Sequence, residues 1–241
     1  MRSISSPDYQ YPPSKNIYWQ KLQSLQNQIY LDHDTEKYCG QWRQNFPDKN
    51  RFPTDRKLHV EIGCNAGHVV TEWAAQNLTN AYIGIDYKSK AIYKAMVKLQ
   101  KKALQNLIFL RSQALRLKYI FAENEIDFLY LFFPDPWPKK SQQKKRTVSS
   151  DWIQSITPLV KPGGLFHIKT DHPDYFHQIE ETLSTSLNEW EIQEHNTHLY
   201  QNHPAPETLE IPDVTLFERI FIREGKQIQS MKLQKKTSHG M

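Results

Sequence analysis

An aspartate between two prolines stands in the stretch FPDPWPKKSQQKKR, residues 133–146. Proline fixes its own φ and restricts the residue before it, so Asp135 is predicted to lie in a rigid, extended turn. A carboxylate offers two neighbouring acceptors, which match the N1–H and N2–H donors on the Watson–Crick edge of guanine. We therefore predict that Asp135 holds a planar base. A proline-rich turn whose aspartate caps the next element fits the tripeptide equally well.

A basic arm follows this turn. A basic run alone is most often a solvated surface, but beside a fixed carboxylate and Trp137 it favours contacts with the phosphates of a nucleic acid whose base enters a pocket. A second carboxylate, Asp171, closes the stretch LFHIKTD and is predicted to lie at the same edge of the protein. The basic residues of the arm are Lys139, Lys140, Lys144, Lys145 and Arg146.

A second group of residues suits a nucleotide-like ligand with a positive charge. The stretch EIGCNAG, residues 61–67, begins with Glu61 and contains two turn glycines, and the next predicted strand ends in Asp86. A carboxylate at that place can accept from both hydroxyls of a ribose. Asn65 stands where a dinucleotide fingerprint has a glycine, and Glu61 would repel a pyrophosphate but attract an ammonium or sulfonium. The pattern favours S-adenosylmethionine over NAD, unless the glycines are ordinary turn residues.

Composition narrows the class of protein. The 241 residues carry a net charge of +5, which weakly favours an anionic partner. Two cysteines without a CxxC pair argue against a disulfide scaffold, and His167 and His172 lack a third clustered ligand, so no metal is expected. The N-terminus has no apolar segment of a signal peptide, and no run is long enough for a membrane helix. A cytoplasmic protein without a membrane segment is expected, as a monomer or a homodimer.

Alternating strand and helix patterns must position these groups. Strands are predicted at 57–62, 81–85, 106–110, 126–133 and 165–170, with helices at 67–78, 89–104, 149–160 and 173–187. This alternation indicates an α/β domain with a mostly parallel sheet, in which ligands bind at the carboxyl ends of the strands. Segments 190–195 and 215–222 are predicted to close the sheet as an antiparallel pair.

Two terminal regions are predicted to lie outside the domain at 55–225. Residues 1–54 are polar and proline-dotted, which predicts a loosely packed, partly disordered N-terminal extension with one helix around 17–30. Residues 226–241 are basic and are predicted to form a disordered tail.

The stretch FPDPWPKKSQQKKR resembles the signature of the bacterial tRNA (guanine-N7-)-methyltransferases. The similarity extends to EIG at 61–63, YIGID at 82–86, KTD at 169–171 and TLFE at 215–218, and it covers roughly residues 57–222. It implies a Rossmann-like, seven-stranded sheet of the class I S-adenosylmethionine-dependent methyltransferases. It also implies methyl transfer to N7 of guanosine 46 in the variable loop of tRNA, with Asp135 as the catalytic acid. Because guanine N7 needs no deprotonation, we expect Asp135 to orient the guanine and stabilise the cationic product.

The resemblance carries roles to individual residues. Glu61, Gly63, Asp86, Gln113 and Asp135 are implied to bind the cofactor. Lys139, Asp171, Thr215, Leu216, Phe217 and Glu218 are implied to bind the substrate, and the segment 141–146 to contact RNA.

Three departures from the family pattern stand out. Gln113 replaces an acid expected near the adenine, Leu216 fills a place often held by lysine, and SQQKKR lacks the usual leading arginine and histidine. These three departures predict altered tRNA affinity with the methyl-transfer chemistry intact.

Two alternative functions remain open: a methyltransferase acting on a protein or small molecule, and a non-enzymatic RNA-binding protein with a decayed cofactor pocket.

Overall fold

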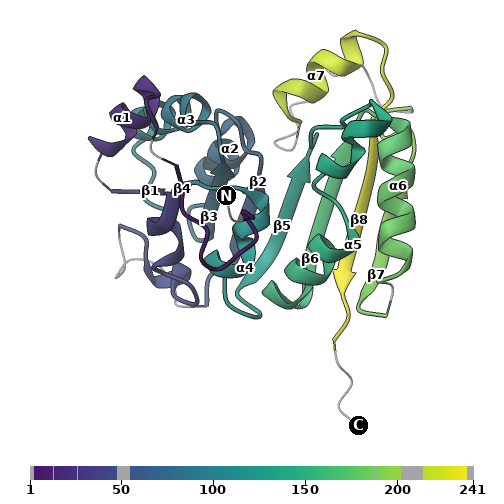
Figure 1. Cartoon of the computed structure of the whole chain (residues 1–241), viewed down its shortest axis with the longest axis horizontal. Coiled ribbons are helices and arrows are strands. Elements are labelled where there is room, and N and C mark those ends of the chain that lie inside the picture. The colour runs from purple at the N-terminus through teal and green to yellow at the C-terminus, as the bar shows by residue number, and fades with distance from the viewer. Residues whose placement is uncertain are drawn as a thin grey trace.

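A computed structural model describes residues 3–12, 14–25, 27–47, 55–186, 188–201 and 214–237. Within these residues, strands form one eight-stranded sheet in the order β1-β4-β3-β2-β5-β6-β8-β7 (Figure 1). The strands are β1 (Ile29–Leu31), β2 (Leu58–Ile62), β3 (Ala81–Asp86), β4 (Leu107–Arg111), β5 (Ile126–Phe132), β6 (Val160–Thr170), β7 (Trp190–Asn196) and β8 (Gln229–Lys235). The pairs from β1 to β6 are parallel, whereas β8 runs antiparallel to both β6 and β7.

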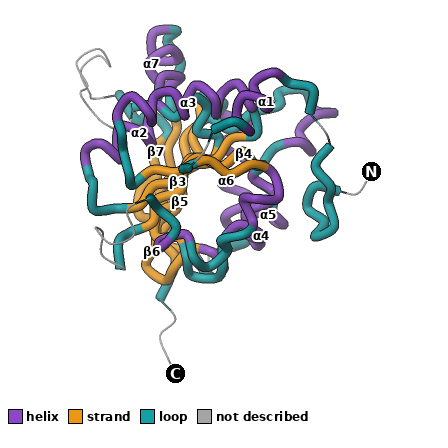
Figure 2. The backbone as a smooth tube through the Cα atoms, turned by 90° about the vertical axis from the view of Figure 1, so that its left-hand side faces the viewer, coloured by secondary structure: helices purple, strands orange, loops and turns teal. Residues whose placement is uncertain are grey.

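Helices cover both faces of the sheet (Figure 2). The α-helices are α1 (Ile17–Gln23), α2 (His68–Gln76), α3 (Ser89–Lys102), α4 (Leu117–Ile120), α5 (Ser150–Ile156), α6 (Pro173–Ser184) and α7 (Leu216–Arg223). Short 3-10 helices are η1 (Asp32–Glu36), η2 (Trp42–Gln44), η3 (Ala114–Arg116), η4 (Lys140–Lys145) and η5 (Thr157–Leu159). The apolar sides of α1, α2 and α3 pack on one face of the sheet, and those of α4, α5 and α6 pack on the other.

The predicted α/β class and the parallel strands are confirmed. Strand order reverses at β2, whose neighbours are β3 and β5. In an open parallel sheet, the loops that follow the strands on either side of such a point run in opposite directions. They leave a crevice beyond the carboxyl ends of the strands. The helices predicted at 67–78, 89–104, 149–160 and 173–187 are present, because their apolar residues recur at helical spacing. Ile92, Ala95 and Leu99 of α3, for example, are all buried.

The N-terminal region is part of the sheet, which corrects the prediction of a loose extension. β1 pairs with β4 and supplies the strand beyond the seven expected. Trp42 and Phe46 are fully buried in the main core, and the buried Arg116 forms an ion pair with the partly exposed Glu36 of η1. Polar residues separate these buried residues in the sequence, so the apolar pattern does not reveal them. The part of the predicted extension at 48–54 lies outside the described residues.

Segment 215–222 is a helix, not the predicted strand. Thr215 accepts from the amide of Glu218, and Glu218 accepts from the amide of Thr215, so the two residues form a capping box that begins α7. Apolar residues at 216, 217, 220 and 221 suit the face of a helix as well as they suit a strand, and the cap decides between them.

The last strand comes from the tail that was predicted to be disordered. Residues 229–235 form β8, inserted between β6 and β7. Met231 and Leu233 are buried in the core, whereas Gln229 and Ser230 are polar although buried. This polar content concealed the strand, which the hydrogen-bond ladders to β6 and β7 stabilise. Residues 238–241 of the predicted tail lie outside the described part of the chain.

Replacing Gly67 by alanine should destabilise the protein by about 3 kcal/mol. Gly67 precedes α2 with φ +63°, and a Cβ there would stand 2.6 Å from the Phe109 ring atom Cζ. Neither the backbone conformation nor the core ring tolerates that atom. Urea unfolding measures the effect. The matched control is Gly63→Ala, at which a Cβ would meet no atom within 4 Å and only the left-handed φ of +73° is penalised. Equal losses in the two variants would contradict the steric argument.

Candidate active site at the carboxyl edge of the sheet

A cavity of about 390 Å³ lies at the carboxyl ends of β2, β3 and β5. Residues from separate segments of the chain meet there, including three of the predicted acids. Asp86 ends β3, Asp135 follows β5, and Asp171 follows β6. The remaining lining residues are Ile62, Gly63, Asn65, Ile85, Tyr87, Lys88, Ser112, Ala114, Leu131, Phe132, Phe133, Pro134, Pro136, Thr147, Phe217, Phe221 and Lys226.

Asp86 organises the glycine-containing loop after β2. Its two carboxylate oxygens accept from the amides of Asn65 at 3.0 Å and Lys88 at 2.8 Å. Burial raises the pKa of Asp86, while the two amide hydrogen bonds oppose that shift. Gly63 turns the loop with φ +73°, and its amide donates to the carbonyl oxygen of Ile85 at 2.8 Å. The carboxylate retains lone pairs toward the cavity for further donors.

Glu61 is a buried acid beside the main cavity. It lines a small adjoining cavity of about 40 Å³, together with His68 and Thr215. Its Oε2 accepts from the amide of Val70 at 3.2 Å. Burial raises the pKa of Glu61 to about 8, and the charge of Asp86 adds to that effect. A cation bound in this place would stabilise the ionised carboxylate.

The turn that carries Asp135 has an unusual backbone. φ is +51° at Phe133 and +43° at Trp137, on either side of the Pro-Asp-Pro sequence. The amide of Phe133 donates to the Lys169 carbonyl oxygen at 2.8 Å, which fastens the start of the turn to β6. Asp135 itself is exposed at the cavity. The carboxylate between the two prolines therefore lines the cavity and is open to solvent.

Asp171 has a partner that sequence reasoning missed. Lys226 donates from Nζ to Asp171 Oδ2 at 3.0 Å, and that hydrogen bond raises the pKa of Lys226. The lysine also lies 4.1 Å from the centroid of the Phe221 ring. Lys226 begins the tail that the sequence predicts to be disordered, so no sequence signal connects it with the site.

The TLFE segment divides into anchoring and exposed residues. Thr215 and Glu218 cap α7, and Glu218 is fully buried, where it accepts from Lys169 Nζ at 3.0 Å and from the Tyr200 hydroxyl. Leu216 and Phe217 are exposed, and Phe217 lines both cavities. Of the four residues of this segment, all implied to bind substrate, only these two are exposed. Thr215 and Glu218 hold α7 beside the site.

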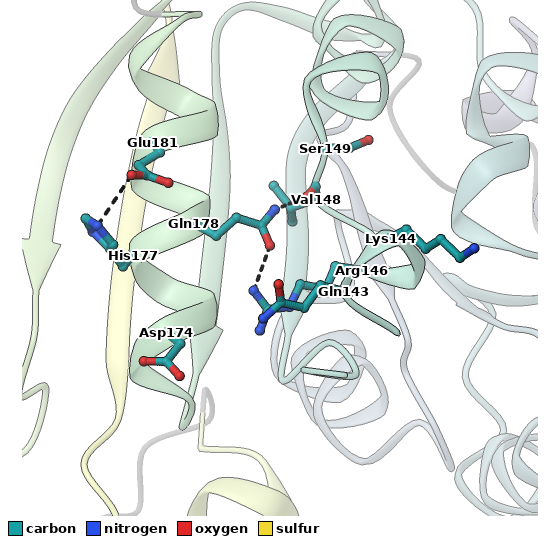
Figure 3. Close-up of a pocket in the computed structure, with 9 residues that line it drawn as sticks. All are labelled: Gln143, Lys144, Arg146, Val148, Ser149, Asp174, His177, Gln178 and Glu181. Atoms are coloured by element: carbon teal, nitrogen blue, oxygen red, sulfur yellow. Dashed lines mark hydrogen bonds and ion pairs between the residues drawn. The ribbon is translucent and has the colours of Figure 1, made fainter. Parts of the chain in front are cut away.

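The basic arm is exposed along most of its length. Lys139, Lys140, Lys144 and Lys145 are exposed, and Lys145 Nζ lies 4.7 Å from the centroid of the Trp137 ring. Arg146 differs. It is buried between η4 and α6, and its part in RNA contact stays a prediction (Figure 3).

Gln113 does not line the cavity, although its neighbours Ser112 and Ala114 do. The Ser112 hydroxyl lies 3.1 Å from the hydroxyl of Tyr11, so the N-terminal region reaches this rim. The two histidines beside KTD have structural partners. His167 lies 2.9 Å from the Ser230 hydroxyl, with its pKa lowered to about 2 by burial, and His172 caps α6. Over the described ranges, no three potential ligand side chains cluster as a metal site would need.

Residues 55–231 match the model of a family described as "Putative methyltransferase". A tRNA (guanine-N(7)-)-methyltransferase of Lachnoclostridium phytofermentans is 32% identical over 202 residues, which cover 84% of this chain and 89% of that protein. This chain belongs to the tRNA (guanine-N(7)-)-methyltransferase family.

Two other similarities concern a longer relative and a solved structure. A bifunctional glycosyltransferase/methyltransferase of Fusobacterium nucleatum is 28% identical over 91% of this chain, and this chain spans 33% of its length. The 16S rRNA methyltransferase KamB matches in structure with a TM-score of 0.54 at 14% identity, covering 75% of this chain and 88% of KamB. The second match establishes the class I methyltransferase fold of this family member. Among its described helices, none is long and apolar enough to cross a membrane.

Proposed function

We propose that this protein transfers the methyl group of S-adenosyl-L-methionine to N7 of guanosine 46 in the variable loop of tRNA, in the cytoplasm. The observation that carries this proposal is the meeting of three acids, Asp86, Asp135 and Asp171, in one cavity beside an exposed lysine arm. Membership of the tRNA (guanine-N(7)-)-methyltransferase family supports it.

The residues present fit S-adenosylmethionine. Glu61 is a buried carboxyl with no cationic partner among the described residues, so the positive charge of the cofactor would relieve its desolvation. Asp86, held in place by two amides, would accept from the ribose hydroxyls. The turn at Gly63 brings backbone, not side chain, to the cavity wall. When bound, the cofactor supplies an electrophilic methyl group on a sulfonium.

Guanine N7 carries a free lone pair, so no proton must be removed before it attacks. The protein's task is positioning, which can supply about 7–11 kcal/mol in favourable cases. Asp135 would accept from N1–H and N2–H of the base and place negative charge near the purine as it becomes cationic. Asp171, partly neutralised by Lys226, lines the same cavity and would assist in orientation. The exposed lysines would bind phosphates.

The proposal is tested by methyl transfer from labelled S-adenosylmethionine to unmodified tRNA transcripts that carry guanosine or adenosine at position 46. We expect incorporation with guanosine alone, and chain scission specific for 7-methylguanine at that position. Incorporation at another nucleotide, or into protein and not tRNA, would contradict the proposed substrate.

A further inference from the structure

The far end of the Asp135 turn needs an anchor. The left-handed backbones of Phe133 and Trp137 are disfavoured for residues with a Cβ and persist only where surrounding contacts hold them. β6 holds the first end through the Phe133 amide, which donates to the Lys169 carbonyl oxygen at 2.8 Å. Beyond Asp135, the next backbone acceptor along the chain is the carbonyl oxygen of Pro136.

Arg146 occupies that acceptor. Its Nε donates to the Pro136 carbonyl oxygen at 2.7 Å, and its Nη1 donates to Gln178 Oε1 of α6 at 2.8 Å. Its guanidinium carbon lies 4.7 Å from the centroid of the Tyr175 ring, and the residue is only 7% exposed. Gln178 also donates to the Val148 carbonyl oxygen at 2.9 Å, and the Val148 amide donates to the Tyr175 hydroxyl at 3.1 Å. Figure 3 shows the Arg146–Gln178–Val148 connection.

We propose that Arg146 is a positioning residue that fastens the Asp135 turn to α6, and that it does not contact RNA. The proposal rests on the role proposed above for Asp135. Arg146 directly follows the exposed Lys144 and Lys145, and Lys145 in turn lies over the Trp137 ring. Arg146 and Lys145 therefore join the lysine arm to the turn that carries Asp135. As a result, the phosphates bound by the arm and the base held by Asp135 stay at a constant distance from each other.

The geometry allows a direct chemical test. A surface cavity of about 460 Å³ is lined by Arg146 and Gln178, so an alanine at position 146 would leave a space open to small ions (Figure 3). In Arg146→Met and Arg146→Ala we expect kcat to fall about 100-fold, because misplacement of about 1 Å at a reacting group has an effect of that size. The KM for tRNA and the Kd of S-adenosylmethionine should stay within about threefold. Guanidinium ion should restore kcat in Arg146→Ala but not in Arg146→Met, whose side chain fills the space.

The contrasting variant is Lys140→Met/Lys144→Met, in the exposed part of the arm. It should raise the KM for tRNA and reduce the salt dependence of binding, with kcat at saturating tRNA preserved. The same signature in Arg146→Met would make Arg146 an RNA contact and overturn the proposal, as would unchanged kinetics. If the variants at 146 do not fold, Gln178→Leu decides, with an expected loss of about tenfold in kcat and an unchanged KM.

A measurement without substrate separates this inference from the proposed function. Amide hydrogen exchange of residues 133–139 should be faster in Arg146→Met than in the wild type, because the turn loses one of its two anchors. Unchanged exchange would refute the anchor even if tRNA is methylated as proposed. Faster exchange would support it even if the wild type methylates another substrate.

Discussion

Asp135→Asn is expected to lower kcat by about 10²- to 10³-fold, the usual effect of removing one preorganised electrostatic group from an active site. The amide is neutral, so the charge that would stabilise the cationic purine disappears. Its NH₂ group also turns one acceptor into a donor that faces the N–H groups of guanine. Single-turnover methyl transfer at saturating tRNA and cofactor isolates this step from binding.

Two further variants separate charge from position. Asp135→Glu keeps the charge on a longer stem and should give an intermediate rate, because the backbone of the turn is fixed and the carboxylate is displaced. Asp174→Asn removes an exposed carboxylate from the first turn of α6, outside the main cavity, and should leave the rate unchanged. Near-normal turnover by Asp135→Asn would show that the acid neither orients the base nor stabilises its charge.

Affinity for S-adenosylmethionine is expected to increase with pH up to about 8, the value to which burial raises the pKa of Glu61. Below that pH the free protein carries a protonated Glu61, and binding of a cation beside it requires the proton to leave. The dissociation constant should therefore fall by up to about tenfold per pH unit between pH 6 and pH 8, and then level off. Calorimetry in buffers of different ionisation enthalpy would detect the released proton.

Glu61→Gln is the control for this linkage. It should bind the cofactor more weakly at pH 8, and its cofactor affinity should not change with pH between pH 6 and pH 8.

The raised pKa of Glu61 also predicts that pH affects the stability of the cofactor-free protein. Because the pKa of Glu61 is higher in the folded than in the unfolded protein, the folded state binds the extra proton, and the unfolding free energy falls as pH rises from about 4.5 toward 8. If cofactor affinity and unfolding free energy changed with pH equally in the wild type and in Glu61→Gln, both expectations would be contradicted.

Local sequence determined the parallel core and the residues that gather at its edge. Buried strands such as 81–86 are short and nearly continuous in apolar residues, and the acids follow them directly, so chain order alone places Asp86, Asp135 and Asp171 at one sheet edge. The rigidity of Asp135 is equally local, because proline restricts its own backbone and that of its neighbour. Those features depend on residues adjacent in the chain.

Tertiary structure alone decided which polar residues are buried and what they hold. Arg146 is indistinguishable in sequence from the lysines before it, but its donors reach Pro136 and Gln178 inside the protein. Glu218 and Lys169 are neutralised by each other across 49 residues of sequence, and the polar strand β8 is stabilised by ladders to β6 and β7. Burial of a charged or polar side chain depends on partners distant in the chain, because only a satisfied hydrogen bond or ion pair offsets its desolvation.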